Sequence, residues 1–264
     1  MVHTDLSALC RQLRQDVLEM IHAAGSGHPG GSLSAVEILT ALYFDVMNVD
    51  PQNPGDPDRD RFILSKGHAA PILYAALARK GYFDPAMLPT LRSLGSPLQG
   101  HPHMHMLPGL DCSSGSLGQG LSVANGLAFA AKKLNKSYRT YCLMGDGEVQ
   151  EGQVWEAFML VNHYKLDNFC AIIDNNGLQI DGKVSDVMSP YPIVDKLAAF
   201  GFHVETVDGH DFDQIEAAFA AANQHKNGPT AIVMTTTKGK GVSFMENNAG
   251  WHGKAPNDAE REQA

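Results

Sequence analysis

The sequence predicts an α/β fold in which helices cover both faces of a mostly parallel central sheet. Amphipathic patterns alternate with short apolar runs along the second half of the chain, as in strand–helix–strand units. The chain has 264 residues, of which 44% are hydrophobic and 19% charged, which is enough for a large core. No internal repeat or convincing domain boundary interrupts it, so we expect one domain over residues 1–264.

The first half of the chain is predicted to be mainly helical. Residues 6–23 place apolar side chains at spacings of three and four, which indicates an amphipathic helix that ends at the Gly/Pro segment 25–31. A second helix is expected from Ser34 to about Met47, with Glu37 as the capping-box partner of Ser34. The elements that follow are a Pro/Asp-rich loop over 50–60, a strand over 62–64, a helix ending at Lys80 and a long loop over 94–120.

From residue 121 the pattern becomes regular. The expected elements alternate as helix 121–134, strand 138–144, helix 152–164, strand 169–174, helix 193–200, strand 203–207, helix 211–224 and strand 230–235. We expect the polar tail from Lys254 to Ala264 to be frayed. In open α/β sheets, ligands bind at the carboxyl ends of the strands, so functional residues are sought there.

Composition excludes several classes of function. Twenty Lys and Arg against 29 Asp and Glu give a net charge of −9, which disfavours binding to nucleic acid or an anionic membrane. No apolar run reaches the length of a transmembrane helix, and the charged N-terminus lacks a signal peptide. The four cysteines are far apart, which is typical of reduced thiols in a cytoplasmic protein and makes a zinc site improbable.

Two predicted strand ends carry oxygen ligands. Gly145-Asp146-Gly147 ends one strand, and Asp174 to Leu178, which includes Asn176, ends the next. One strand–helix–strand unit should therefore place the Asp146 carboxylate near the Asn176 amide, and such hard oxygens suit Mg²⁺ or Ca²⁺. Gly-Asp-Gly is also ordinary turn chemistry, so alone it is a weak signal. A later basic loop with Lys238 could close over a phosphate or could simply be a turn.

Six segments in order resemble the N-terminal half of the transketolases, a family of thiamine-dependent enzymes. The resemblance covers about residues 10–255 and includes a thiamine-diphosphate-binding signature. The segments are SGHPGGSLS, SKGHAAP, GSLGQG, GDGEVQEGQVWEA, IDNNGLQIDG and KGKGVSFMENNAGWHG. The resemblance implies a thiamine-diphosphate-binding fold, with thiamine diphosphate and Mg²⁺ as cofactors and Ca²⁺ or Mn²⁺ as possible replacements.

The resemblance also implies roles for individual residues. The metal would be bound by two side chains and one backbone carbonyl, from Asp146, Asn176 and Leu178 respectively. The cofactor would contact Gly147, His68, His252 and the loop Gly115-Ser116-Leu117. Catalytic roles in the substrate channel would fall to His28 and His101, with His252 at the diphosphate. Glu151 and Glu156 would form an acidic relay between active sites, although a solvated acidic face explains them as well.

The implied activity is transfer of a two-carbon ketol unit from a ketose phosphate to an aldose phosphate. Members of the family continue with a domain that binds the aminopyrimidine ring, and no such segment follows Ala264. We therefore expect the diphosphate-binding subunit of a split transketolase, active only with a separate partner chain and assembled as α₂β₂.

Three alternatives are considered. One is the alpha-type subunit of another thiamine-dependent enzyme, such as a 2-oxo acid dehydrogenase, which has little use for the channel histidines. Another is a non-catalytic regulatory subunit; the intact Asp146 and Asn176 argue against it. A nicotinamide-binding Rossmann enzyme is a poor third, because the glycine spacing over 115–120 is wrong and does not directly follow a predicted strand.

Overall fold

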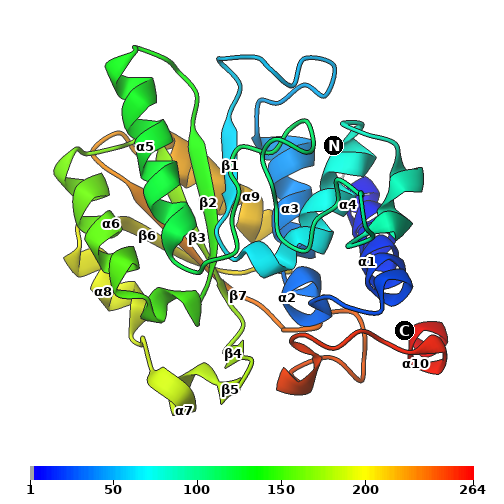
Figure 1. The fold of residues 1–264 in the computed structure, drawn as a ribbon. Coiled ribbons are helices and arrows are strands. Elements are labelled where there is room, and N and C mark those ends of the chain that lie inside the picture. The colour runs from blue at the N-terminus through cyan, green and yellow to red at the C-terminus, as the bar shows by residue number, and fades with distance from the viewer. Residues whose placement is uncertain (1–2) are drawn as a thin grey trace.

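The computed structural model describes residues 3–264, with side chains from Leu6 onward, and its centre is a five-stranded sheet (Figure 1). All neighbouring strands of this sheet are parallel. In their order across the sheet, the strands are β1 (Arg61–Leu64), β2 (Thr140–Gly145), β3 (Phe169–Asn175), β7 (Thr230–Thr235) and β6 (His203–Asp208). A small antiparallel hairpin lies beyond β3 and consists of β4 (Leu178–Gln179) and β5 (Gly182–Lys183).

Helices cover both faces of the sheet, as Figure 1 shows. One layer contains α1 (His3–Ala24), α3 (Val36–Ala41), α4 (Ala70–Lys80) and α9 (Phe212–Gln224). The other contains α5 (Gln119–Lys133), α6 (Gly152–His163) and α8 (Ile193–Ala199). Side chains of β2 alternate between the layers: Tyr141 and Leu143 join the apolar cluster of the first, Cys142 and Met144 that of the second. The predicted fold class is confirmed.

Shorter helical elements complete the chain. They are α2 (Pro29–Leu33), η1 (Leu42–Val46), η2 (Gly67–Ala69), η3 (Pro85–Thr90), η4 (Glu148–Gln150), α7 (Val184–Met188), η5 (Ala249–Trp251) and α10 (Asp258–Gln263). None of the helices within residues 3–264 is both long and apolar enough to cross a membrane. The four cysteines are free thiols.

The predicted helix from Ser34 to Met47 is wrong in its start and in its continuity. A short helix already begins at Pro29, because proline is well suited to the first helical position. Ser34 forms no capping box; its hydroxyl instead donates to Asp174 Oδ2 over 2.6 Å. Glu37 accepts hydrogen bonds from Arg14 instead, so both side chains are engaged in long-range contacts that no local pattern reports.

The tail is not frayed, contrary to the expectation. Residues 258–263 form α10, whose start carries a capping box between Asn257 and Glu260. An ion pair of Arg261 with Glu19 at 2.6 Å and a hydrogen bond between the His22 ring and Asp258 at 2.8 Å connect this helix to α1. Figure 1 shows the terminal helix beside the N-terminal layer.

The strand order places a switch point between β3 and β7. The chain moves from β2 to β3 through α6 on one face, whereas it returns from β6 to β7 through α9 on the other. The loops that leave β3 and β7 therefore diverge at the carboxyl edge of the sheet, which opens a crevice suited to a ligand.

Candidate functional site

A pocket of about 260 Å³ lies at this carboxyl edge. Loops after β1, β2, β3 and β7 contribute to its wall. Eight of the residues singled out from the sequence line it: His68, Leu117, Asp146, Gly147, Glu151, Asn176, Leu178 and His252. Five do not: His28, His101, Gly115, Ser116 and Glu156.

The three proposed metal ligands converge because β2 and β3 are adjacent. Gly145 pairs with Asp174 at the strand ends, so the two following loops meet. Asp146 Oδ2 accepts from Gly177 N at 2.7 Å, which ties the two loops together. The Asn176 Oδ1 atom accepts from Leu178 N at 3.1 Å, and the Leu178 carbonyl accepts from the Lys238 ammonium at 3.1 Å.

The Asp146 carboxylate is buried, and its hydrogen bonds offset only part of the cost of removing its charge from water. Besides Gly177, its carboxylate accepts from Gly147 N at 2.9 Å and from the Tyr191 hydroxyl at 3.0 Å. Burial, and then the charge of Asp174, nevertheless raise the pKa of Asp146 to about 6. A nearby cation would favour the ionised form. Within residues 3–264, no three His, Cys, Asp or Glu side chains form a metal cluster, and the proposed ligand set contains only one carboxylate.

Asp174 is the central anchor of the site. It is fully buried, and its carboxylate accepts from the Lys66 ammonium, the Thr236 hydroxyl, the Ser34 hydroxyl and the Asn176 amide. Burial raises the pKa of this carboxyl, but the charge of Lys66 and these hydrogen bonds outweigh burial and lower it. Three segments that are distant in sequence, those of Ser34, Lys66 and Thr236, are thus fixed to one side chain.

Four histidines gather beside the pocket. The His28 ring lies 5.4 Å from His68, 5.5 Å from His252 and 6.3 Å from His101, between ring centroids. His68 stacks on His252 at 5.1 Å. His28 and His101, which do not line the pocket itself, are therefore continuous with it through the other two rings.

These imidazoles are held neutral. Burial is the main cause, followed for His28 by the charges of Arg92 and His101, and the pKa of His28 is lowered to about 4. Burial and the charge of Lys238 lower the pKa of His252 to about 3. Burial likewise lowers the pKa of His68 and His101. At neutral pH each of the four imidazole rings is therefore uncharged. Each can donate a hydrogen bond to a ligand from one ring nitrogen and accept one at the other.

The loop Gly115-Ser116-Leu117 reaches the site by close backbone contact. A Cβ atom on Gly67 would stand 2.7 Å from Gly115 N, so only glycine fits between the two loops. Gly115 lies against the His101 ring, and Leu117 enters the pocket wall. Ser116 connects these two residues and does not line the pocket.

The structure separates Glu151 from Glu156. Glu151 precedes α6 and lines the pocket, whereas Glu156 lies in a surface groove between α5 and α6. Five residues along a helix amount to a rotation of about 140° away from the first position, which accounts for their different directions. Unlike these two residues, Glu148 is a buried glutamate at the pocket, where it accepts from Ser65 Oγ at 2.6 Å and Gly118 N at 2.8 Å.

Sequence reasoning missed several residues of the site. Lys66, Asp174 and Glu148 all lie at the carboxyl ends of predicted strands, and this position could have identified them. Lys238 stands in the sequence only as part of a basic loop, yet it is 2% exposed and faces the pocket. Its loop is fixed from behind, because Thr237 N donates to His210, whose ring in turn bonds Glu37.

A parallel sheet with buried lysines, neutral histidines and hard oxygen ligands at its carboxyl edge is typical of a domain that binds a phosphate-bearing cofactor. The family model described as "Transketolase, thiamine diphosphate binding domain" matches residues 5–264. The chain therefore belongs to the transketolase family. The family prediction and the transketolase-type transferase function are confirmed.

Individual relatives agree with this assignment. The chain is 46% identical to a 6-deoxy-6-sulfo-D-fructose transketolase subunit from Clostridium sp. (strain MSTE9), covering 94% of this chain and 90% of the relative. It is 45% identical to an apulose-4-phosphate transketolase subunit from Phocaeicola vulgatus, covering 95% and 89%. A transketolase structure from Pichia stipitis in complex with sedoheptulose 7-phosphate superposes with a TM-score of 0.94 at 32% identity, over 99% of this chain and 40% of that one.

Proposed function

We propose that the carboxyl-edge pocket holds thiamine diphosphate together with a divalent metal ion, and that the chain completes a transketolase active site with a second subunit. The observation that carries this proposal is the convergence of Asp146, Asn176 and the Leu178 carbonyl on a pocket bordered by four neutral histidines. These residues come from loops and short elements, among them β4 for Leu178 and η2 for His68, at the same edge of the sheet.

The oxygen donors fit a divalent cation. Carboxylate, amide and backbone carbonyl oxygens are the ligands that Mg²⁺ and Ca²⁺ take, and Mg²⁺ commonly keeps phosphate oxygens or water at its other positions. The Leu178 carbonyl already accepts from a cation, the Lys238 ammonium. We therefore expect Mg²⁺, with Ca²⁺ or Mn²⁺ as replacements, bound by Asp146, Asn176 and Leu178.

The cationic and histidine side chains of the pocket fit a diphosphate. Lys238 is buried there, and burial followed by the charge of Lys66 lowers its pKa to about 8. The Nδ1 atom of His252 is buried without a hydrogen-bond partner among the described residues, as expected of a group that waits for a ligand. Gly31 carries no side chain beside His68: a Cβ would lie 3.2 Å from His68 Nε2.

Bound thiamine diphosphate would supply the electron sink for breaking a carbon–carbon bond next to a carbonyl. The residues of this chain then orient the sugar and handle its protons. Arg92 Nη2 lies 3.4 Å from His28 Nδ1 and can donate to it, which leaves the proton of the neutral ring on Nε2. His28 Nε2 would donate to a sugar oxygen, while His101, nearby, would exchange protons with the hydroxyls of the substrate.

We further propose that a separate chain carries the pyrimidine-binding domain, with an α₂β₂ assembly. Two relatives that are named as subunits have nearly this length, since the chain covers 90% and 89% of them. A surface groove between α5 and α6, bordered by the exposed apolar Leu160 and Tyr164, would contact a neighbouring chain and place Glu156 in a relay. The two relatives are named for different sugars, so for this chain we propose ketose and aldose phosphates only as a class. A cytoplasmic location stays a prediction.

Calorimetric titration with thiamine diphosphate and Mg²⁺ tests the proposal, first on this chain and then with its candidate partner. We expect weak or no binding alone, tight binding with the partner, and loss of that binding when EDTA replaces Mg²⁺. Asp146→Ala should weaken cofactor binding by at least about 100-fold, whereas the matched exposed Asp208→Ala should not change it. No cofactor binding in either state would contradict the enzyme function and favour a regulatory subunit.

A further inference from the structure

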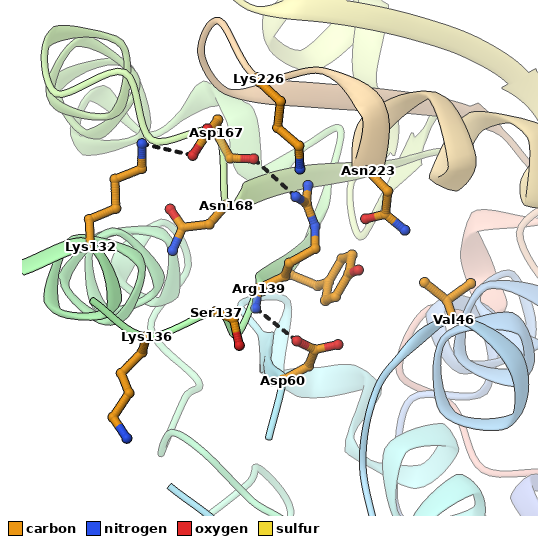
Figure 2. Close-up of a pocket in the computed structure, with 11 residues that line it drawn as sticks. Val46, Asp60, Lys132, Lys136, Ser137, Arg139, Asp167, Asn168, Asn223 and Lys226 are labelled. Carbon is orange, nitrogen blue, oxygen red and sulfur yellow. Dashed lines mark hydrogen bonds and ion pairs between the residues drawn. The ribbon is translucent and has the colours of Figure 1, made fainter. Parts of the chain in front are cut away.

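A second pocket, of about 380 Å³, opens at the opposite edge of the sheet. It lies where β2 and β3 begin and where α5 and α9 end, with Arg139, Asn168 and Asn223 in its wall (Figure 2). The cofactor pocket lies at the carboxyl ends of the same strands. The seven residues of β3 put the two pockets about 20 Å apart. The transketolase chemistry proposed above makes no use of this pocket.

The pocket concentrates positive charge on an acidic chain. Its wall contains four cationic side chains and two carboxylates, whereas the whole chain carries a net charge of −9. Both carboxylates are already engaged. Asp60 accepts from the backbone N–H groups of Asn48 at 2.9 Å and Arg139 at 2.7 Å, and Asp167 pairs with Lys132 at 2.7 Å.

Two of the cations lack a carboxylate partner among the described residues. The Arg139 guanidinium donates to the backbone carbonyls of Asp167 and Ala222, each at 3.0 Å, and to the hydroxyl of Tyr141, none of which is a carboxylate. Its Nε atom is buried without a partner. Lys226, in the segment between α9 and β7, has no hydrogen bond or ion pair with any other residue that the structure describes. Figure 2 shows its side chain pointing toward the Arg139 guanidinium.

Uncharged polar groups surround these two cations. Asn168 Nδ2 donates to Ala128 O at 3.0 Å, but its Oδ1 atom is buried without a partner. Ser137 and Asn223 are exposed at the rim, with side chains free to meet a ligand. Amide and hydroxyl groups of this kind pair well with the hydroxyls of a small polyol.

We propose that this amino-edge pocket binds the phosphomonoester of a small polyhydroxylated metabolite. Two facing cations without a counterion match the charge of a phosphomonoester dianion, and the planar guanidinium of Arg139 suits phosphate oxygens. In Figure 2 the neutral groups of Asn168 and Ser137 lie on one side of Arg139 and that of Asn223 on the other, so a polyol would have polar partners on either side of the two cations. The pocket is larger than inorganic phosphate requires, which favours an esterified ligand.

The test is an NMR titration of the full chain with glycerol 3-phosphate, inorganic phosphate and sodium chloride, at matched ionic strength. The amide signals of Ser137, which lines the amino-edge pocket, and of Asn227, which directly follows Lys226, report on the amino edge, whereas those of Gly31 and Gly147 report on the cofactor pocket. We expect saturable shifts of Ser137 and Asn227 with glycerol 3-phosphate, at lower concentrations than with inorganic phosphate. The amino-edge signals do not depend on cofactor binding. The amino-edge proposal can therefore fail while the proposed transketolase function holds, and the proposed function can fail while amino-edge binding is observed.

Charge variants sharpen the result. Lys226→Ala should weaken glycerol 3-phosphate binding at the amino edge by about tenfold or more, because a charge-assisted contact is lost. Lys226→Arg should retain binding. The control Lys133→Ala removes an exposed lysine of α5 outside the pocket and should leave the affinity unchanged. The proposal is overturned if the shifts follow ionic strength alone, if Lys226→Ala and Lys133→Ala behave alike, or if inorganic phosphate binds as tightly as the ester.

Discussion

The two edges of the central sheet differ in how completely their buried side-chain polar groups are paired. At the carboxyl edge, Asp174 accepts from four side chains, and Asp146 and Glu148 each accept from three groups. At the amino edge, four buried polar atoms on the strands or directly beside them have no partner among the described residues: Arg139 Nε, Thr140 Oγ1, Asn168 Oδ1 and Thr230 Oγ1. On the carboxyl side, the buried atoms without a described partner are His252 Nδ1, Ser114 Oγ and Arg92 Nε, and they belong to loops around the cofactor pocket and the histidines rather than to the strand ends.

The long-range hydrogen bonds between buried side chains are therefore concentrated at the carboxyl edge of the sheet, where the cofactor pocket lies. Groups that must hold a cofactor in one geometry are fixed beforehand by buried partners, which keeps the site in place before the ligand arrives. Buried groups without partners cost stability, and they are available to a ligand that can satisfy them. Substitutions at matched positions on the two edges should therefore change stability in opposite directions.

The largest expected effect comes from Asp174→Asn. The substitution removes the charge that compensates the buried Lys66 ammonium, and breaking such a pair from one side costs about 3–5 kcal/mol. Urea unfolding followed by tryptophan fluorescence should show this loss in the free energy of unfolding. Asp208→Asn is the control, because that aspartate is exposed at the same edge and should change stability by less than about 1 kcal/mol. A small effect of Asp174→Asn would mean that Lys66 is solvated and that the edge is not preorganised.

Thr236→Val should be the next largest effect. The Thr236 hydroxyl, just beyond β7, donates to the Asp174 carboxylate. Because a hydrogen bond to a charged group is worth about 1.5–3 kcal/mol, the variant should lose about 2 kcal/mol in the free energy of unfolding. The neighbouring exposed Thr235 provides the control, since Thr235→Val removes no such contact. Equal values for the two variants would contradict the role of Thr236.

The histidine cluster predicts a pH dependence. The folded-state pKa values of His28 and His252 are lowered to about 4 and about 3, mainly by burial and by the facing charges of Arg92, Lys66 and Lys238. Below about pH 6.5 the unfolded state binds protons that the folded state does not, so stability falls as the pH is lowered toward 4.

Removing one of these rings should flatten this dependence. The difference in unfolding free energy between pH 7 and pH 5 should shrink by about 1 kcal/mol in His252→Gln, after a discount for its partial exposure. His163→Gln, which replaces an exposed histidine of α6 outside the cluster, should keep the full difference. An unchanged pH dependence in His252→Gln would show that the ring is protonated in the folded state at pH 5.

Much of the fold could be predicted because its signals are local. Apolar runs predicted all five strands of the main sheet, and the predicted strand ends indicated Asp146 and Asn176, which the structure brings to one pocket. The failures arise from contacts that are distant in sequence. Ser34 looked like a helix cap, but its hydroxyl bonds a residue 140 positions away. The partnership of Lys66 with Asp174 spans 108 positions and leaves no pattern in either local segment.

The direction in which side chains point was the second feature that could not be predicted from the sequence. The resemblance to the family grouped Glu151 with Glu156, but only the helix geometry shows that one lines the pocket while the other lies in the α5–α6 groove. The basic character of the amino-edge pocket was equally hidden. Arg139 and Lys226 lie 87 positions apart (226 − 139) and meet only because β2 and the segment after α9 reach the same edge.

The smallest expected effect, of opposite sign, belongs to Thr230→Val at the other end of β7. Thr230 is 1% exposed and its hydroxyl has no partner among residues 3–264. Folding removes the Thr230 hydroxyl from water without giving it a hydrogen-bond partner, which costs free energy. Valine has nearly the same shape and no hydroxyl, so in Thr230→Val the free energy of unfolding should rise by about 0.5–1 kcal/mol. Urea unfolding of Thr230→Val and Thr236→Val side by side measures the contrast between the two ends of β7. If Thr230→Val were destabilising instead, the hydroxyl would have a partner in solution, such as a bound water, and the amino edge would be as fully paired as the carboxyl edge.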